Sequence, residues 1–331
     1  MIGIQRMSDK SSSSLNSRSL SHVSHNPTVS VIMNCFNGEK YLREAIDSVY
    51  AQTYVDWEII FWDNASTDNS REIVRNYDSR LKYFRGNKTI PLYAARNCAL
   101  KQASGRYIAI LDCDDMWLPK KLELQMAAFE KITLGLVHTN AEVIEYNGTR
   151  RAFHNRKQPS GMVFRELLRD YRINLQTVMI SRDALEGLDY WFDESMMIAG
   201  DADMFLRIAY RWELLYIPEV TACYREHGSS LTATRIESLP EETEEIIRNL
   251  TREYNDIPAK YSRDIKAYKR GTRLAVVVAK LKYVGGSEAR KAILRNIKSP
   301  GYFLLMYILT FLPYKLIHFM RYKLLKGISC L

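Results

Sequence analysis

Short apolar runs alternate with segments of helical periodicity over the first part of the chain. Runs rich in Val, Ile and aromatic residues at 29–33, 58–62, 81–84 and 107–111 predict four strands, the first of them buried and the third short. Apolar positions recur at helical spacing in 41–52 and 94–100, and Ser66, Thr67 and Asp68 predict the N-cap of a helix through Val74. A further helix is expected after Pro119. This alternation predicts an α/β fold with an open, mostly parallel sheet flanked by helices.

Polar residues directly follow three of these predicted strands. They occupy 34–37, 63–64 and 112–115, at the carboxyl end of each strand. Ligands of open α/β sheets bind beyond the carboxyl ends of the strands. We therefore expect the three groups to meet at one edge of the sheet and to form the functional site.

The second part of the chain has a different pattern. Its periodicity after residue 136 predicts no topology, although 237–282 is densely charged and helical in period. Residues 299–314 carry no charge but are fewer than the roughly 20 apolar residues that span a bilayer, which favours a helix in the membrane interface. A buried or dimer-forming helix is the alternative. Whether 299–317 inserts into a bilayer or packs on the protein therefore stays open.

The distribution of charge supports the membrane interpretation. The net charge is +9, and 289–331 contains no acidic residue. Basic residues in that segment stand at 290, 291, 295, 298, 315, 321, 323 and 326. Each basic residue close to anionic lipid contributes on the order of 1 kcal/mol. Because apolar residues are interleaved with them, the segment suits an anionic membrane surface better than nucleic acid.

Composition excludes several other classes of protein. An apolar fraction of 47% and a charged fraction of 26% are typical of a globular protein with a core. Five widely spaced cysteines without a CxxC pair argue against a disulfide framework or a zinc site, and they suit a reducing cytoplasm. Residues 1–26 are Ser-rich and lack the apolar region of a secretory signal, so we expect a disordered leader.

The densest group of reactive side chains is Asp112-Cys-Asp-Asp115. Three carboxylates this close repel one another unless a cation or hydrogen-bond donors neutralise them. Mg²⁺ and Mn²⁺ accept such oxygen ligands and need few from the protein when phosphates supply others. Taken alone, the group fits a turn or helix N-cap as well as a metal–diphosphate site.

The order of motifs along the chain favours the metal site. The motifs are VSVIMNCFN (29–37), YL (41–42), SVYAQT (48–53), DNASTD (63–68), ARN (95–97) and GRYIAILDCDDMWLP (105–119). Taken in this order, they resemble the family 2 glycosyltransferases, whose fold is called GT-A. The resemblance implies a sugar transferase that uses a nucleotide-sugar donor and a divalent metal, Mn²⁺ or Mg²⁺.

The resemblance also implies which residues bind the donor nucleotide. The loop after the first strand is expected around the base, the end of the second strand at the base edge and ribose, and Asp112 near the ribose. The implied residues are Asn34, Phe36, Asp63, Asn64, Arg96 and Asp112. A surface arginine on a helix is the alternative for Arg96. Many relatives have two aspartates where this chain has Asp63-Asn64, and this departure leaves the identity of the base open. Uridine is favoured, with thymidine and guanosine as alternatives.

The same resemblance implies the metal ligands and the catalytic base. Asp114 is the expected metal ligand of the DxD-type pair, Asp115 supports the loop, and His227 in YREHGSSLT (224–232) is a further metal or phosphate contact. An ordinary surface or core histidine is the alternative for His227. Asp201 in GDADMFLR (200–207) is the expected general base, with a helix N-cap as its alternative role. Relatives usually have Glu-Asp here, where this chain has Gly-Asp.

These expectations combine into one prediction of function. Residues 27–235 are expected to form the GT-A catalytic domain, with a nucleotide-binding half at 27–118 and an acceptor half at 119–235, and 236–331 a helical, membrane-associated extension. The predicted reaction is inverting, from a UDP-sugar in the first place, to a glycan or lipid-linked acceptor in surface polysaccharide or lipopolysaccharide synthesis. The predicted location is the cytoplasmic face of the membrane, and a homodimer stays open. The alternatives are a catalytically degenerate partner of another transferase and a sugar nucleotidyltransferase.

Overall fold

The computed structural model describes residues 26–228, 230–296, 307–308 and 310–311. The strands are β1 (Val29–Cys35), β2 (Trp57–Asp63), β3 (Leu81–Arg85), β4 (Tyr107–Ile110), β5 (Met116–Trp117), β6 (Leu136–Ile144), β7 (Arg150–Ala152), β8 (Met179–Ser181) and β9 (Leu214–Arg225). The helices are α1 (Leu42–Tyr50), α2 (Ser70–Val74), α3 (Leu92–Leu100), α4 (Lys121–Phe129), α5 (Phe164–Arg169), α6 (Arg182–Glu186), α7 (Gly200–Arg211), α8 (Leu231–Arg235), α9 (Leu239–Glu253), α10 (Ile257–Lys260), α11 (Ser262–Tyr283) and α12 (Gly286–Asn296), with short 3-10 turns at Leu175–Thr177 and Ile236–Ser238.

Within the described residues, the strands form one sheet of nine in the order β3-β2-β1-β4-β8-β6-β9-β5, with β7 beside β6. The four predicted strands β1 to β4 are present, and they pair in parallel as expected. The other half, for which the sequence predicted no topology, is mixed: β8 is antiparallel to both β4 and β6, whereas β9 is parallel to β6. The carboxyl ends of β1, β2, β4 and β9 therefore share one edge of the sheet.

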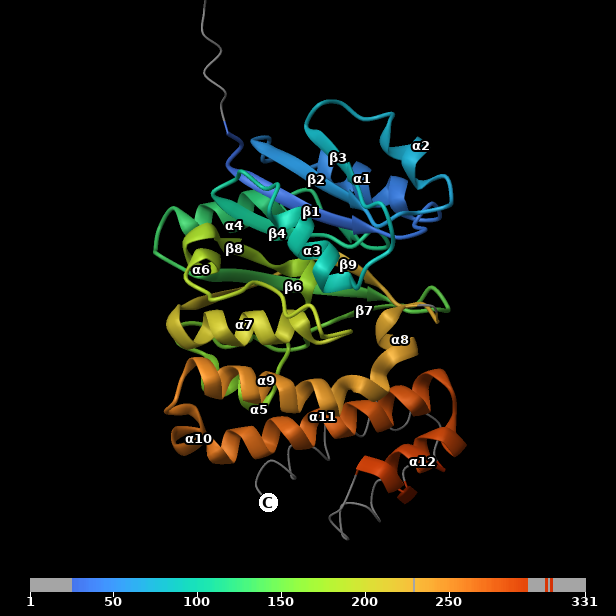
Figure 1. The fold of residues 1–331 in the computed structure, drawn as a ribbon, viewed down its shortest axis with the longest axis vertical. Coiled ribbons are helices and arrows are strands. Elements are labelled where there is room, and N and C mark those ends of the chain that lie inside the picture. The colour runs from blue at the N-terminus through green and yellow to red at the C-terminus, as the bar shows by residue number, and fades with distance from the viewer. Residues whose placement is uncertain (1–25, 229, 297–306, 309, 312–331) are drawn as a thin grey trace, which may run out of the picture.

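Hydrophobic cores cover both faces of this sheet. One core lies under α1, α2 and α4 and includes Val31, Ile46 and Phe61. The other lies under α3, α5 and α7 and includes Ile32 and Phe205. Alternate residues of β1 thus enter opposite cores, as the period of a strand requires. Figure 1 shows α7 lying along the lower face of the sheet and starting near the carboxyl end of β4.

The helices after β9 form further layers on the same side as α7 (Figure 1). They confirm the helical periodicity predicted for 237–282. Ile246 and Leu250 of α9 and Tyr268 of α11 belong to the core that contains α7. The predicted division into a catalytic domain and an extension at residues 235 and 236 stays a prediction, and the two parts share this core.

The expectations for the helix N-cap at 66–68, for the membrane segment and for the leader compare with the structure as follows. The helix expected after 66–68 begins at Ser70, with Asn69 at its N-cap position and no side-chain capping bond from it; Asp68 Oδ1 accepts the Ser70 N–H instead, at 3.0 Å. Among the described residues, no helix is long and apolar enough to cross a membrane. The predicted leader lies outside the described residues, apart from Asn26, and so does most of the predicted interfacial segment 299–317.

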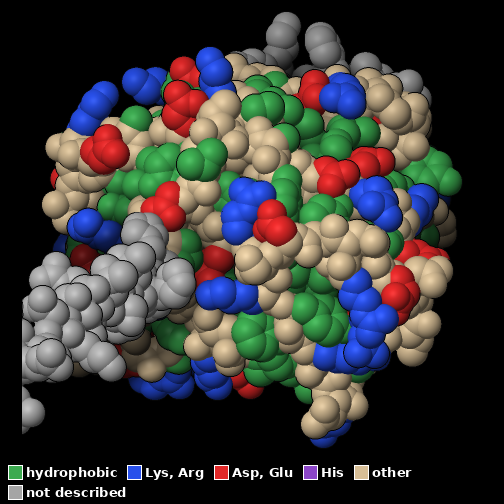
Figure 2. All heavy atoms as spheres, turned by 90° about the horizontal axis from the view of Figure 1, so that it is seen from above, with side chains coloured by type: hydrophobic (Ala, Val, Ile, Leu, Met, Phe, Trp, Pro, Cys, Tyr) green, Lys and Arg blue, Asp and Glu red, His purple; other side chains and the backbone are tan. Residues whose placement is uncertain are grey.

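Charge is mixed over the face seen in Figure 2. Lys and Arg side chains are interspersed there with Asp and Glu, among hydrophobic and other residues. The described part of that face accordingly has the appearance of an ordinary globular surface.

Candidate active site

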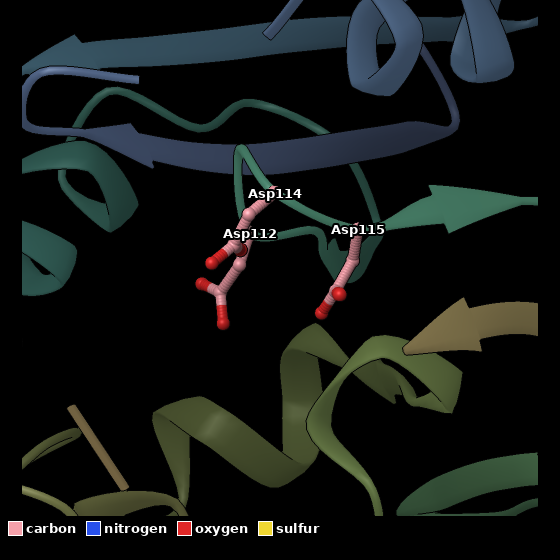
Figure 3. A group of neighbouring side chains, drawn as sticks. All are labelled: Asp112, Asp114 and Asp115. Atoms are coloured by element: carbon pink, nitrogen blue, oxygen red, sulfur yellow. The ribbon is translucent and has the colours of Figure 1, made fainter. Parts of the chain in front are cut away.

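The acidic loop, Asp112 to Asp115, follows β4 at the carboxyl edge of the sheet. Figure 3 shows the carboxylates of Asp112 and Asp114 next to each other, with Asp115 further along the loop. One oxygen of each of the three carboxylates lies within 4.8 Å of the others. The structure therefore brings together the acidic residues that the sequence singled out, although each has different partners.

Asp112 is held between two side chains from other elements. Arg96 of α3 donates from Nη2 to Asp112 Oδ1 at 2.6 Å, and Gln176 donates from Nε2 to Oδ2 at 2.7 Å. The Gln176 Oε1 also accepts the Asp112 N–H at 2.8 Å. Arg96 is only 3% exposed, so the alternative of a surface arginine on a helix is wrong. A buried, charge-assisted pair of this kind fixes the side chain of Asp112.

Asp114 points toward the end of β9. His227 Nε2 lies 2.8 Å from Asp114 Oδ2, and both side chains are partly exposed. Arg225 donates from Nε to the Asp114 carbonyl oxygen at 3.0 Å, so β9 also fixes the backbone of the loop. The structure thus brings together the two residues predicted as metal contacts from sites more than a hundred positions apart in the chain.

Asp115 is buried and contacts the backbone of β9. It is 2% exposed, and its Oδ1 accepts the Arg225 N–H at 2.7 Å. Burial raises the pKa of Asp115 well above its usual range, and the charges of Asp114 and Asp112 raise it further. Asp115 therefore ties the acidic loop to β9, in agreement with its predicted role of supporting the loop.

The carboxyl ends of β1 and β2 contribute the residues predicted to bind the nucleotide. The Asn34 side chain is buried, and neither its oxygen nor its nitrogen has a hydrogen-bond partner. A buried amide without partners costs free energy unless a ligand or water satisfies it. Phe36, two residues later, is 52% exposed. The first predicted nucleotide contact thus combines unused hydrogen-bonding capacity with an exposed aromatic ring.

Unlike Asn34, Asp63 and Asn64 already form hydrogen bonds with other groups of the protein. The Asp63 carboxylate accepts from Ser66 N–H and Tyr83 Oη–H, both at 2.7 Å, and pairs with Arg85. The amide of Asn64 exchanges two hydrogen bonds with the backbone of Ile90, at 2.8 and 3.1 Å. Both residues lie at the predicted edge of the sheet, where they hold the loops that follow β2 and β3.

Asp201 stands in the first turn of α7. Ala199 occupies the N-cap position and Asp201 lies inside the first turn, so Asp201 is not the N-cap residue of α7 and that alternative is wrong. The Tyr93 hydroxyl lies 3.4 Å from Asp201 Oδ1. Burial raises the pKa of Asp201 from 3.8 to about 6, and the nearby positive charge of Arg96 opposes this rise. A carboxyl group with this pKa is ionised at neutral pH and basic enough to accept a proton.

Asp203, two residues further along α7, has a different environment. It is fully buried, and its carboxylate forms an ion pair with Arg207 at 2.8 Å and accepts from Asn249 at 3.2 Å. Its side chain is therefore part of the packing between α7 and α9.

The departure Gly200-Asp201 has a steric explanation. A Cβ atom at Gly200 would lie 2.8 Å from three ring carbons of Tyr93. The Tyr93 ring in turn packs against Phe192, with ring centroids 5.3 Å apart. Tyr93 fills the space that a side chain at position 200 would need, so a glycine there permits the contact between Tyr93 and Asp201.

Sequence reasoning missed Gln176, Tyr93 and Arg225. Gln176 lies in a 3-10 turn that the irregular pattern after residue 136 did not reveal, and Trp117 Nε1 fixes its backbone carbonyl at 2.8 Å. Tyr93 lies in the predicted helix next to the ARN motif, where it had the pattern of an ordinary helix residue. Arg225 lies in the YREHG segment, in which only His227 was predicted as a site residue.

The fold and the site together define a protein of the GT-A type, with an acidic loop after the fourth parallel strand. The family model described as Glycosyl transferase family 2 matches residues 30–188. A UDP-Glc:alpha-D-GlcNAc-diphosphoundecaprenol beta-1,3-glucosyltransferase, WfgD of Escherichia coli, is 36% identical over 165 residues, which are 50% of this chain and 64% of that protein. An uncharacterized glycosyltransferase, MJ1057 of Methanocaldococcus jannaschii, is 32% identical over 207 residues, which are 60% of this chain and 71% of that protein.

A solved structure has the same fold. The mannosyltransferase PcManGT from Pyrobaculum calidifontis, in complex with GDP-Man and Mn²⁺, aligns over 92% of this chain and 87% of that chain, with a TM-score of 0.58 and 20% sequence identity. The chain belongs to the family 2 glycosyltransferases, as the ordered motifs indicated. It spans less than two thirds of the length of the E. coli relative.

Proposed function

We propose that this protein transfers a sugar from a nucleoside-diphosphate sugar to an acceptor hydroxyl, with inversion at the anomeric carbon. The observation that carries the proposal is the arrangement around Arg96, which pairs with Asp112 of the acidic loop at 2.6 Å and whose charge acts on Asp201. A donor-side carboxylate and a basic carboxylate of pKa about 6 thus face one buried cation. One base opposite one leaving group gives a single displacement.

The donor nucleotide would occupy the carboxyl edge of β1, β2 and β4. The unsatisfied Asn34 amide offers both a donor and an acceptor to a base, and the exposed Phe36 ring offers a stacking surface. Asp112 and Arg96 would contact the ribose and the diphosphate. Asp63 and Asn64 would position the base indirectly, through the loops that they hold. They would contact it directly only if the nucleotide displaced their present hydrogen-bond partners. The name of the E. coli relative gives UDP-Glc as its donor, which supports a uridine donor here.

A divalent ion, Mn²⁺ or Mg²⁺, fits the residues at Asp114. Asp112 is paired with Arg96, and Asp115 is buried against β9 with a raised pKa, which leaves Asp114 as the carboxylate suited to an ion, with His227 beside it. One or two protein ligands suffice for a metal that also binds a diphosphate. When bound there, such an ion would offset the negative charge that develops on the leaving diphosphate. The Mn²⁺ in the PcManGT complex supports this choice.

The acceptor side is formed by α7. Asp201 would remove the proton of the acceptor hydroxyl as the new glycosidic bond forms. The Tyr93 hydroxyl, 3.4 Å from Asp201 Oδ1, would hold the carboxylate in place. Burial of Asp201 keeps its basicity high, because a solvated aspartate of pKa 3.8 would accept a proton less readily than one of pKa about 6.

The biological setting proposed is synthesis of a surface polysaccharide or lipopolysaccharide at the cytoplasmic face of the membrane. Support comes from the E. coli relative, whose name places its substrate on diphosphoundecaprenol, a lipid carrier. The basic and apolar residues of 289–331 suit an anionic membrane surface. The acceptor is proposed to be a glycan or lipid-linked sugar, and a homodimer remains an additional prediction.

The proposal is tested by measuring release of nucleoside diphosphate from a panel of UDP-, dTDP- and GDP-sugars with Mn²⁺, with Mg²⁺ and with a chelator. We expect one donor class to be turned over, and turnover to cease when the metal is removed. The anomeric configuration of the product, read from NMR coupling constants, should be opposite to that of the donor. Absence of turnover and of binding for every donor would refute the proposal.

A further inference from the structure

Two cysteines lie side by side beneath the candidate active site. Cys35 ends β1, next to Asn34, and Cys113 stands between Asp112 and Asp114 in the acidic loop. The register that pairs β1 with β4 aligns Ile32 with Ile110, and Cys35 and Cys113 each follow three residues later. Residues at the same level of neighbouring strands project to the same face of a sheet.

The positions of the sulfur atoms confirm this proximity. A Cβ atom built on Gly38 would lie 2.7 Å from the Cys35 Sγ and 2.9 Å from the Cys113 Sγ. Both sulfurs therefore surround one point, and only a glycine fits above them. Both thiols are free, with Cys35 buried and Cys113 partly exposed. They project toward the core under α1 and α2, so the mechanism proposed above uses neither.

We propose that Cys35 and Cys113 are a thiol modification site, which low-molecular-weight disulfides such as oxidised glutathione convert into a reversible intramolecular disulfide. The thiolate of one of the two cysteines attacks the external disulfide, forming a mixed disulfide and releasing one thiol. The thiolate of the other cysteine then attacks the protein sulfur of that mixed disulfide, forming the Cys35–Cys113 bond and releasing the second thiol. The two protein thiols are oxidised and the external disulfide is reduced, so electrons and protons balance.

The disulfide would act on the site through the acidic loop. A disulfide requires Cβ atoms about 3.8 Å apart and a narrow range of dihedral angles. Forming the bond fixes Cys113 to the end of β1, and Asp112 and Asp114 flank Cys113 on either side. We expect the backbone of the acidic loop to adapt to the disulfide geometry, which would shift Asp114 relative to His227 and Asp112 relative to Arg96 and Gln176. Misplaced support of a metal ligand costs about 10- to 100-fold in metal affinity. This consequence rests on the proposed function, whereas formation of the disulfide does not.

The experiment uses the full chain and a matched background variant in which Cys98, Cys223 and Cys330 are all replaced by Ser. Each protein is equilibrated with oxidised glutathione, alkylated and mapped by mass spectrometry, and UDP binding with Mn²⁺ is measured before and after. We expect a peptide linking Cys35 to Cys113 in both proteins. We also expect a loss of about 10- to 100-fold in UDP affinity that dithiothreitol reverses.

Single variants Cys35→Ser and Cys113→Ser provide the specific control. Each single variant lacks the second thiol, so its oxidation can go no further than a mixed disulfide with glutathione, and the peptide linking positions 35 and 113 should be absent from both. Two free thiols in the oxidised wild type, a mixed disulfide that does not resolve, or a disulfide without effect on UDP binding would each overturn the proposal. If the reduced wild type binds no nucleotide, the proposed function fails, while the peptide mapping still decides whether the disulfide forms.

Discussion

Replacing Asp201 with Asn should make the protein more stable while removing its activity. The native fold raises the pKa of Asp201 from 3.8 to about 6, chiefly by burial. At about 1.4 kcal/mol per pH unit, the ionised carboxylate costs the native state on the order of 3 kcal/mol. A neutral amide of the same shape avoids this cost. If Asp201 is the general base, its loss should lower kcat about 10²- to 10⁴-fold.

The pH dependence of this gain follows from the sign of the shift. A carboxyl whose pKa is raised on folding binds its proton more tightly in the native state, so its ionisation destabilises the fold as pH rises. The advantage of Asp201→Asn should therefore be absent below about pH 3.8, grow between 3.8 and about 6, and stay constant above that. The assay is urea unfolding of both proteins at pH 4.0, 5.0 and 7.5, with the slope m compared to confirm that the same transition is measured.

Asp203→Asn is the matched control, two residues away on the same helix. Asp203 is buried as well, but it neutralises the fully buried Arg207 at 2.8 Å. Removing it breaks a buried ion pair and leaves the guanidinium with the more distant Glu253 carboxylate, at 4.0 Å, as its counter-charge. Breaking a buried pair typically costs about 3–5 kcal/mol. The two substitutions should thus shift the free energy of unfolding in opposite directions at pH 7.5. Equal destabilisation by both, or full activity of Asp201→Asn, would refute the roles assigned here.

Three further predictions follow from the same site. The kcat of the wild type should fall tenfold per pH unit below about pH 6, because protonated Asp201 cannot act as a base; a pH–rate profile that is flat down to pH 5 would contradict this. Gly200→Ala should destabilise the fold by about 1–3 kcal/mol and lower kcat, because its methyl group meets the Tyr93 ring at 2.8 Å, and thermal unfolding with an activity assay checks both effects. Gln176→Ala should weaken donor binding about tenfold by freeing Asp112, which calorimetry measures directly, and unchanged affinity would count against it.

The first half of the fold followed from local pattern. Strands β1, β2 and β4 are buried on both faces, so they appear in the sequence as largely apolar runs, whereas β3 is an edge strand of mixed exposure; parallel pairing follows from the helices between them. The second half depends on pairing between segments far apart in the chain, such as β4 with β8 and β6 with β9. No local periodicity encodes such a choice, so the mixed sheet could not be predicted.

The candidate site divides in the same way. The acidic loop and Asp201 lie within motifs whose order is visible in the sequence. Their partners Gln176 and Tyr93 depend on tertiary packing, as does the engagement of Asp63 by Arg85. The steric reason for Gly200 also became visible only when the Tyr93 ring was placed beside it. The sequence thus singled out the residues proposed to react, while the structure supplied the groups that hold them.

Asp114 is proposed to bind the metal that holds the donor, and Asp201 is proposed to remove the proton of the acceptor hydroxyl. The most direct test compares wild type, Asp114→Asn and Asp201→Asn in binding of the donor sugar nucleotide with Mn²⁺ and in turnover with acceptor. We predict that Asp114→Asn loses metal-dependent donor binding, whereas Asp201→Asn keeps donor binding within about twofold and loses turnover. Donor binding that is unaffected by Asp114→Asn, or turnover that survives Asp201→Asn, would contradict the account.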